Sequence, residues 1–284
     1  MVLELNQVKK NYDNFNLDCS IRVEEGCVTG IIGRNGAGKS TTFKAILGLI
    51  HTDGGTVTFD GKTEMTKELK QEIGVVLSDS GFSEYLTIND IINIAKAMYP
   101  KFHKEEFVEK CKYFSLPLNQ KIKEFSTGMK VKLKVLFAMS YEARLLILDE
   151  PTAGLDVVVR EEVLDMLREY METEGRSIIV SSHISSDLES LCDDFYFIEN
   201  GSIILHEETD VLLDQYGVLK VTEEQYDAID KSYILGCKKE NFGYLCLTKE
   251  KDYYRENYPE VVIEKGNINE LITIMLAKQR KERV

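Results

Sequence analysis

The chain of 284 residues carries 35 Lys and Arg against 48 Asp and Glu, a formal net charge of −13. This acidic balance disfavours general nucleic-acid binding, because duplex affinity depends on neutralising backbone phosphates, and no nucleic-acid partner is expected. Hydrophobic residues make up 43% and charged residues 29%, which are ordinary values for a globular protein of one or two domains.

The apolar runs are short. The most apolar of them, 145–148, 178–180 and 271–277, fall well below the roughly 18–20 residues of a membrane-spanning helix. The N-terminal residues lack the apolar core of a secretion signal. Six cysteines are scattered without a Cys-x-x-Cys pair, which argues against a zinc or redox motif and favours reduced thiols in a cytosolic protein.

Through residue 205, short β-rich runs alternate with helical segments, which is typical of α/β proteins. A hairpin is expected at 195–205 around the turn Asn200-Gly201. Between Thr87 and Tyr141 the pattern becomes helical, opening with the capping box Thr87-x-x-Asp90, and this predicts a helical insertion at about 82–141. Strands are predicted at 3–8, 17–23, 27–32, 56–59, 74–77, 145–148 and 178–181.

The composition changes near residue 210. Residues 211–284 hold 12 basic and 13 acidic side chains, a net of −1, against −12 for the preceding part, and half of the 14 tyrosines also lie there. This shift predicts two domains, 1–208 and 209–284. The second shows the order β-α-β-β-α-β and a capping box at Thr222-x-x-Gln225, which predicts a small α+β layer of ferredoxin-like type.

The sharpest motif follows an apolar strand and precedes a helical run: Gly33-Arg-Asn-Gly-Ala-Gly-Lys-Ser40. Glycines let consecutive backbone N–H groups surround phosphate oxygens, and the next helix presents its positive end to them. Lys39 is the candidate ligand of the β- and γ-phosphates, and the Ser40 hydroxyl that of Mg²⁺. The predicted nucleotide-binding residues here are Gly33, Arg34, Asn35, Gly36, Ala37, Gly38, Lys39, Ser40 and Thr41.

A second motif stands about 110 residues further on. Four apolar residues, 145–148, predict a buried strand that ends in Asp149 and Glu150. In a parallel sheet this end opens at the phosphate crevice. Asp149 is therefore the candidate to hold hydrated Mg²⁺, and Glu150 the candidate general base that polarises water. Together the two motifs predict ATP and Mg²⁺ as the bound cofactors.

Three further motifs narrow the family. Residues 125–129, Phe-Ser-Thr-Gly-Met, resemble the LSGGQ signature of ATP-binding cassette (ABC) ATPases. The run 149–156 is similar to that family's strand end and D-loop, and Ser181-Ser182-His183 matches its switch histidine. The resemblance covers about residues 1–205 and is to ATP-binding subunits of bacterial exporter-like ABC transporters with a C-terminal extension. It implies a P-loop NTPase fold with an antiparallel β subdomain and a helical insertion.

The resemblance also implies residue roles. Tyr12 would stack on adenine, while Ser126 and Gly128 would contact the γ-phosphate held by a second subunit. His183 would contact the γ-phosphate and position Glu150 and the water. Asp156 would cross the interface between the two subunits, which would form a homodimer or a related heterodimer.

Two departures from the family pattern stand out. Thr127 replaces a signature glycine, and the glutamine of the family's Q-loop is absent. Either Ser78 or Asp79 occupies its slot. Ser78 would reach the metal only through water, whereas Asp79 would add a negative charge, so both coupling and basal rate depend on which residue faces the site.

The implied function is ATP hydrolysis that powers a separate membrane-spanning permease through head-to-tail closure of two subunits. The chain would then be cytoplasmic, held at the inner face of the cell membrane by the permease, which would dock on the helical insertion near Phe82 and Tyr85. A soluble ABC ATPase, for example in iron–sulfur assembly, is the alternative. A GTPase or small-molecule kinase would leave residues 125–129 unexplained.

Overall fold

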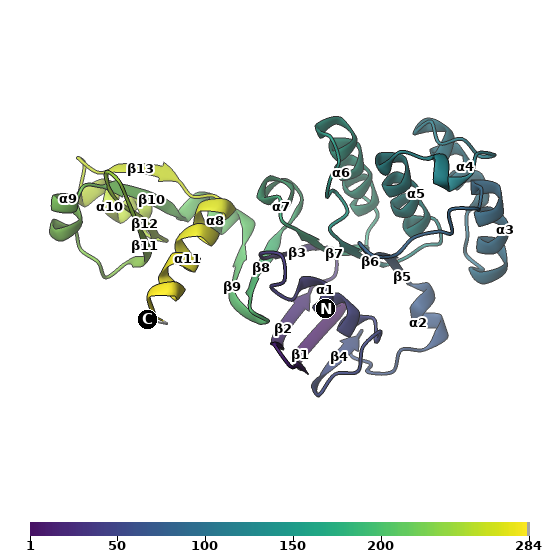
Figure 1. Cartoon of the computed structure of the whole chain (residues 1–284), viewed down its shortest axis with the longest axis horizontal. Helices are drawn as coiled ribbons and strands as arrows, with labels where there is room; N and C mark the ends of the chain where they lie inside the picture. Colours follow the sequence, from purple (N-terminus) through teal and green to yellow (C-terminus); the bar gives the residue numbers. More distant parts are fainter. Residues whose placement is uncertain (283–284) are drawn as a thin grey trace.

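The computed structural model describes residues 1–282, and side chains through residue 277. Figure 1 shows two sheets joined end to end, with helices packed around both. The larger has nine strands in the order β4-β1-β2-β9-β8-β3-β7-β6-β5. These are β1 (Leu3–Tyr12), β2 (Phe15–Val23), β3 (Val28–Ile32), β4 (Gly54–Phe59), β5 (Ile73–Val76), β6 (Leu145–Asp149), β7 (Ser177–Ser182), β8 (Asp194–Glu199) and β9 (Ser202–Glu208).

The nine-stranded sheet has a parallel and an antiparallel part, as predicted. Strands β5, β6, β7, β3 and β8 run parallel, whereas β4, β1 and β2 are antiparallel. The difference follows from the sequence, because β3, β6 and β7 are buried along their whole length while β2 alternates buried and exposed residues. The buried parallel strands carry the loops that form the candidate site.

Strand β1 is longer than its predicted range, which ended at Val8. The register with β2 shifts between Leu5 and Val8, and Gln7 has a φ of 46° there. A bulge of this kind interrupts the alternation of side chains, so the apolar pattern stops although the ladder continues to Tyr12. The strand therefore reaches the turn that precedes the candidate cleft.

The predicted helical insertion is present. The capping box at Thr87 forms with both hydrogen bonds, and Ser126 caps the last helix of the insertion. Two short elements, α2 (Lys67–Gln71) and η1 (Ile122–Glu124), were not predicted. Besides η1, the insertion contains α3 (Ile88–Met98), α4 (Lys104–Tyr113) and α5 (Thr127–Met139). Outside it, the nine-stranded sheet is accompanied by α1 (Lys39–Ile46), α6 (Val157–Met171) and α7 (Ser185–Leu191).

The second sheet has the order β11-β12-β10-β13, with antiparallel neighbours throughout. Its elements follow the predicted order β-α-β-β-α-β and end in a long helix; the ferredoxin-like assignment stays a prediction. We call residues 217–282 the C-terminal unit. Its elements are β10 (Gly217–Val221), α9 (Glu223–Ala228), β11 (Ile234–Glu240), β12 (Gly243–Thr248), α10 (Lys251–Asn257), β13 (Val262–Lys265) and α11 (Ile268–Glu282).

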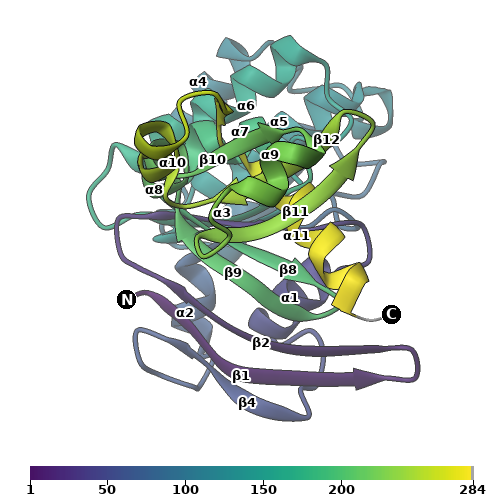
Figure 2. The same ribbon diagram turned by 90° about the vertical axis from the view of Figure 1, so that its left-hand side faces the viewer.

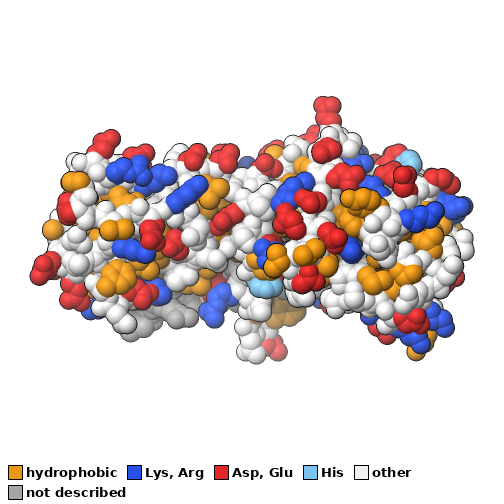
Figure 3. Space-filling model, turned by 90° about the horizontal axis from the view of Figure 1, so that it is seen from above, with side chains coloured by type: hydrophobic (Ala, Val, Ile, Leu, Met, Phe, Trp, Pro, Cys, Tyr) orange, Lys and Arg blue, Asp and Glu red, His pale blue; other side chains and the backbone are white. Residues whose placement is uncertain are grey.

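Helix α8 (Thr209–Gln215) connects the two sheets, and α11 lies beside β11 (Figure 2). One cluster of buried side chains is continuous across this junction, since Leu212, Val218 and Leu247 belong to the same cluster as Phe195 of β8. The division into domains 1–208 and 209–284 therefore stays a prediction. On the face drawn in Figure 3, acidic and basic side chains are interspersed over both parts.

None of the helices in the part of the chain that the structure describes is long and apolar enough to cross a membrane.

Candidate functional site

The predicted phosphate loop connects the end of β3 to the start of α1. A Cβ atom on Gly33 would lie 2.4 Å from the carbonyl oxygen of Ile198, so only glycine fits there. Gly38 has a φ of 118°, a region that side chains disfavour, and α1 begins at the next residue. The loop is thus fixed against the β8–β9 hairpin and directs backbone N–H groups and a helix N-terminus into one cleft.

Lys39 is buried, and its Nζ donates to the carbonyl oxygen of Gly33 at 2.7 Å. The same ammonium lies 3.2 Å from Oε1 of Glu150, across the cleft from the loop. Ala37 is buried and accepts a hydrogen bond from Gly201 rather than lining the cleft. The residues that line the cleft are Phe15, Arg34, Asn35, Gly36, Gly38, Lys39, Ser40, Thr41, Ser78, Glu150, Ala153 and His183.

Glu150 is held in a strained position directly after β6. Its φ is 53°, a left-handed conformation that costs a non-glycine residue about 1–3 kcal/mol. Nδ1 of His183 lies 2.5 Å from its Oε2, and the His183 backbone N donates to the same oxygen at 3.2 Å. The predicted base and the predicted switch histidine therefore contact each other directly.

Asp149 is buried at the last position of β6. Its Oδ1 accepts from the Ser181 hydroxyl at 2.7 Å, and its Oδ2 accepts from the Ser78 hydroxyl at 2.9 Å. Neutral hydroxyl donors orient the carboxylate without cancelling its charge, which suits a ligand of a hard divalent cation. Ser40 lines the cleft together with Ser78, the donor to Asp149, and its hydroxyl has the matching chemistry, so Asp149 and Ser40 fit Mg²⁺.

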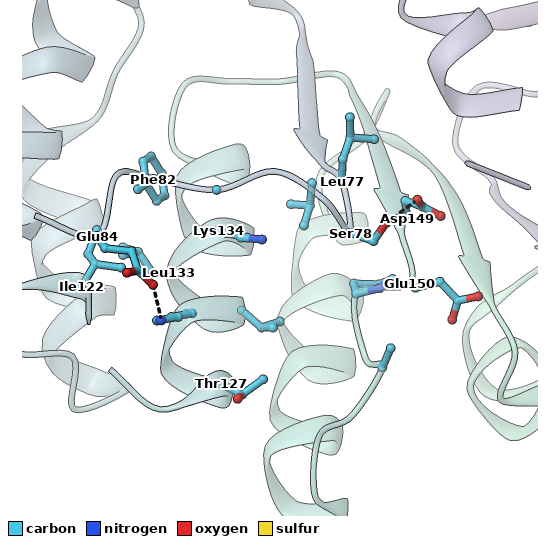
Figure 4. Close-up of a pocket in the computed structure, with 16 residues that line it drawn as sticks. Leu77, Ser78, Phe82, Glu84, Ile122, Thr127, Leu133, Lys134, Asp149 and Glu150 are labelled. Carbon is cyan, nitrogen blue, oxygen red and sulfur yellow. Dashed lines mark hydrogen bonds and ion pairs between the residues drawn. The ribbon is translucent and has the colours of Figure 1, made fainter. Parts of the chain in front are cut away.

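The structure distinguishes the two candidates for the slot of the missing glutamine. Ser78 faces Asp149 (Figure 4), whereas Asp79 forms an ion pair with Lys44 of α1 at 2.8 Å. The hydrogen bond from Lys44 and its charge hold the pKa of the Asp79 carboxyl below its usual value. Ser78 therefore donates a hydrogen bond to Asp149, the predicted metal ligand, whereas Asp79 pairs with α1.

A second cavity, of about 370 Å³, separates Asp149 and Glu150 from the helical insertion (Figure 4). Asp149 and Glu150 border it on one side, and Thr127 and Lys134 of α5 on the other. Lys130, also on α5, pairs with Glu84 at 3.3 Å across its outer end. The signature helix and the phosphate loop are thus set apart within one chain.

Ser126 and Gly128, predicted to contact nucleotide, do not line the cleft of their own chain. The Ser126 hydroxyl accepts from the backbone N of Met129 at 3.2 Å and caps α5. Gly128 packs against α6, where a Cβ would lie 2.7 Å from Val159. Ser126 is exposed and Gly128 partly buried, and neither lies among the residues that line the cleft with Lys39.

The aromatic residue at the cleft is Phe15, which sequence reasoning missed. Tyr12, the predicted adenine contact, is 46% exposed, and its ring centroid lies 6.3 Å from that of Phe15. Tyr12 and Phe15 are directly opposite in the strand register at the β1–β2 turn. A Cβ atom on Gly38 would lie 2.9 Å from Cζ of Phe15, so the Phe15 ring lies against the phosphate loop. The hairpin register, rather than any motif, brings Phe15 to the loop.

A buried polar group connects the segments that follow Glu150 and His183. The Thr152 hydroxyl donates to Asp187 of α7 at 2.6 Å, and Arg160 of α6 pairs with the same carboxylate at 2.7 Å. Asp187 is only 3% exposed. No sequence motif predicted the contacts of Asp187. The predicted D-loop residue, Asp156, caps α6 by accepting from the backbone N atoms of Val158 and Val159.

Comparison with known proteins agrees with this geometry. A family model described as "ABC transporter" matches residues 17–153. The chain is 32% identical over 219 residues to the ABC transporter ATP-binding protein YtrB of Bacillus subtilis (strain 168), covering 76% of this chain and 75% of that protein. It is 32% identical over 221 residues to the lantibiotic transport ATP-binding protein SrtF of Streptococcus pyogenes, covering 74% and 92%.

Among solved structures, the ATP-binding subunit of an ABC transporter superposes with a TM-score of 0.67 at 28% identity, covering 76% of this chain and 93% of that one. In this chain the phosphate loop and Glu150, which follows β6, line one cleft. The chain belongs to the family of ABC transporter ATP-binding proteins and is an ABC ATPase.

Proposed function

We propose that this ATPase powers a separate membrane-spanning permease, through ATP-driven closure of two ATP-binding subunits arranged head to tail. The contact between Glu150, Lys39 and His183 carries the catalytic part, because it places a base, a cation and a hydrogen-bonding histidine around one cleft. The similarity to a lantibiotic transport protein supports the transport role.

In this proposal each group in the cleft has one task. Lys39, now bonded to Gly33 and Glu150, binds the β- and γ-phosphates when ATP is present. Glu150 orients the attacking water and accepts its proton, while His183 holds the carboxylate in place. Bound Mg²⁺, held by Asp149 and Ser40, would neutralise phosphate charge, and Ser78 keeps Asp149 oriented.

The placement of the signature residues supports a paired site. Ser126 and Gly128 lie on another surface from the phosphate loop, so within one chain the cleft lacks them. Next to them, Val157 and Val158 follow Asp156 and are 78% and 70% exposed. Exposed apolar residues beside a D-loop favour burial against a second subunit. The second copy would supply its Ser126 and Gly128 to the γ-phosphate.

The test is the Glu150→Gln variant with ATP and Mg²⁺. It should hydrolyse ATP about 100-fold more slowly, because general-base help is lost, and accumulate as an ATP-stabilised dimer. Light scattering measures the mass directly. The double variant that adds Lys39→Ala should stay monomeric at every ATP concentration. A Glu150→Gln chain that binds ATP and remains monomeric would contradict the paired site.

The permease contact has its own test. Phe82 is partly buried and packs edge-to-face on Phe137 at 5.1 Å, whereas Tyr85 is 75% exposed, so Tyr85 is the more accessible of the two predicted docking residues. Tagged wild-type chain should co-purify with a membrane protein from solubilised cell membranes, and Tyr85→Ala should weaken this. Recovery with soluble iron–sulfur proteins instead would favour the alternative function and remove the assignment to the inner membrane face.

A further inference from the structure

Two cysteines face each other across the β11–β12 hairpin of the C-terminal unit. Cys237 and Cys246 are directly opposite in the strand register, and their Sγ atoms are 2.8 Å apart. Opposite residues in an antiparallel pair have Cα atoms about 4.5–5.5 Å apart, which is within the range of about 4.4–6.8 Å that a disulfide spans. The backbone therefore already has the spacing that a covalent bond between the two requires.

The surroundings of the pair favour reaction. Cys237 is partly exposed, while Cys246 is buried directly behind it. Tyr226 and Tyr244 stack beside them with ring centroids 4.1 Å apart, and the ammonium groups of Lys231 and Lys239 lie 4.6 Å and 5.7 Å from those rings. The partial exposure of Cys237 lets a small reagent reach the pair, and the thiolate is the nucleophilic form of cysteine.

Cys19, Cys111 and Cys192 are buried like Cys246, but reagents reach the Cys237–Cys246 pair through the partly exposed Cys237. Burial raises the pKa of the Cys19 thiol to about 11 and that of Cys111 to about 12. Burial also raises the pKa of Cys192 well above its ordinary value. A buried thiol with a raised pKa is inert, because little thiolate forms and reagents do not reach it. These positions serve as internal controls for the pair.

We infer that Cys237 and Cys246 form a modification site that exchanges with low-molecular-weight disulfides. The Cys237 thiolate attacks a sulfur of the small disulfide, forming a mixed disulfide and releasing one small thiolate. The Cys246 thiolate then attacks Sγ of Cys237 and releases the second small thiolate. The two protein thiols are oxidised to one disulfide, the small disulfide is reduced to two thiols, and the two protons lost by the protein go to these products.

The bond would cross-link the two strands that contact α11, from within the cluster that also holds Tyr226, Tyr244 and Tyr254. Helix α11 contacts both β11 and α7, and the backbone N of its first residue, Ile268, donates to Glu189 of α7 at 2.7 Å. None of these groups lines the nucleotide cleft, so the site is independent of the proposed function. Oxidation should slow amide exchange in β11 and β12, which the bond holds together.

The test uses the full chain at low concentration, treated with cystamine and then with N-ethylmaleimide. Trypsin cuts after Lys238 and Lys239 and so separates the two cysteines, since peptide 232–238 contains one and peptide 240–249 the other. Mass spectrometry should find these two peptides linked, and dithiothreitol should release them. Cys237→Ser should abolish the link, whereas Cys111→Ser should leave it intact.

The peptide map of the wild-type chain decides the outcome even where a variant fails to fold. The inference is overturned if Cys237 stops at the mixed disulfide, if the linked peptides involve other cysteines, or if the bond forms only between two chains. ATP hydrolysis by Cys237→Ser should equal that of the wild type, which confirms that the variant is folded.

Discussion

The nucleotide cleft and the C-terminal unit are held together in different ways. In the cleft, Lys39 and Glu150 form an ion pair at 3.2 Å, and each has a predicted chemical task that depends on its charge. In the C-terminal unit, the buried residues Val218 and Leu247 only need to be apolar and of suitable size. Chemistry therefore leaves motifs in a sequence, whereas packing leaves only periodic patterns.

The largest expected effect is a loss of ATP affinity at the cleft, with the C-terminal unit left unchanged. Under the proposed function, Lys39→Ala removes charge-assisted hydrogen bonding to phosphate, worth about 1.5–3 kcal/mol for each bond, so ATP should bind about 100-fold more weakly. Titration calorimetry measures the affinity. Lys44→Ala is the matched control, because Lys44 lies on the same helix and pairs with Asp79; its affinity should stay within about threefold of wild type. Equal losses in both variants would contradict a specific phosphate contact.

Much of the cassette could be predicted because its signals are local. The run 145–148 is buried throughout as β6, and the capping boxes at Thr87 and Thr222 formed as their spacing indicated. The phosphate loop and the Asp149-Glu150 pair lie in one cleft because both follow parallel strands. Adjacent positions in sequence carried all of this information.

What could not be predicted depends on contacts between distant segments. Phe15 reaches the cleft through the register of the β1–β2 hairpin, and Asp187 meets Thr152 only once α7 has packed. The choice between Ser78 and Asp79 depended on Lys44, which lies 35 residues away in sequence from Asp79. The continuity of the core across α8 likewise follows from tertiary packing and left no pattern in the sequence.

The next effect tests whether the C-terminal unit unfolds with the cassette. Leu247 is fully buried in the cluster that also contains Phe195, so Leu247→Ala should lower the free energy of unfolding by about 2–5 kcal/mol. Because the cluster is continuous, both regions should lose protection together in urea, as hydrogen exchange with mass spectrometry would show. The partly buried neighbour Leu245 is the control, and Leu245→Ala should cost less. Loss of protection in 217–277 alone would separate the two regions.

A smaller effect concerns the slot of the missing glutamine. Ser78→Ala removes the hydroxyl that orients Asp149, and loss of such a contact to a metal ligand typically weakens metal affinity about 10-fold or more. The Mg²⁺ concentration for half-maximal ATP hydrolysis should rise accordingly. Ser80→Ala is the control, because its hydroxyl bonds only the carbonyl oxygen of Leu77. An unchanged Mg²⁺ dependence in Ser78→Ala would show that Ser181 alone orients Asp149.

The smallest effect concerns the polar contact between the two regions. Glu207 of β9 accepts from Lys249 at 2.7 Å and from the Tyr216 hydroxyl at 2.8 Å. Burial alone would raise the pKa of Glu207, but these hydrogen bonds outweigh it, and the pKa is lowered from 4.5. Because the folded pKa is the lower one, the contact stabilises the fold above the unfolded pKa and is lost as pH falls through the folded pKa.

Lys249 is 40% exposed, so solvent screening keeps this contribution below about 1 kcal/mol. The wild type should be slightly more stable than Glu207→Gln near neutral pH, and the difference should vanish as the pH falls through the lowered pKa of Glu207. Urea unfolding at a series of pH values measures it, with Glu208→Gln as the exposed neighbouring control. A difference that persists unchanged in acid would mean that Glu207 acts through packing, and the junction would then resemble the apolar core beneath it rather than the charged cleft.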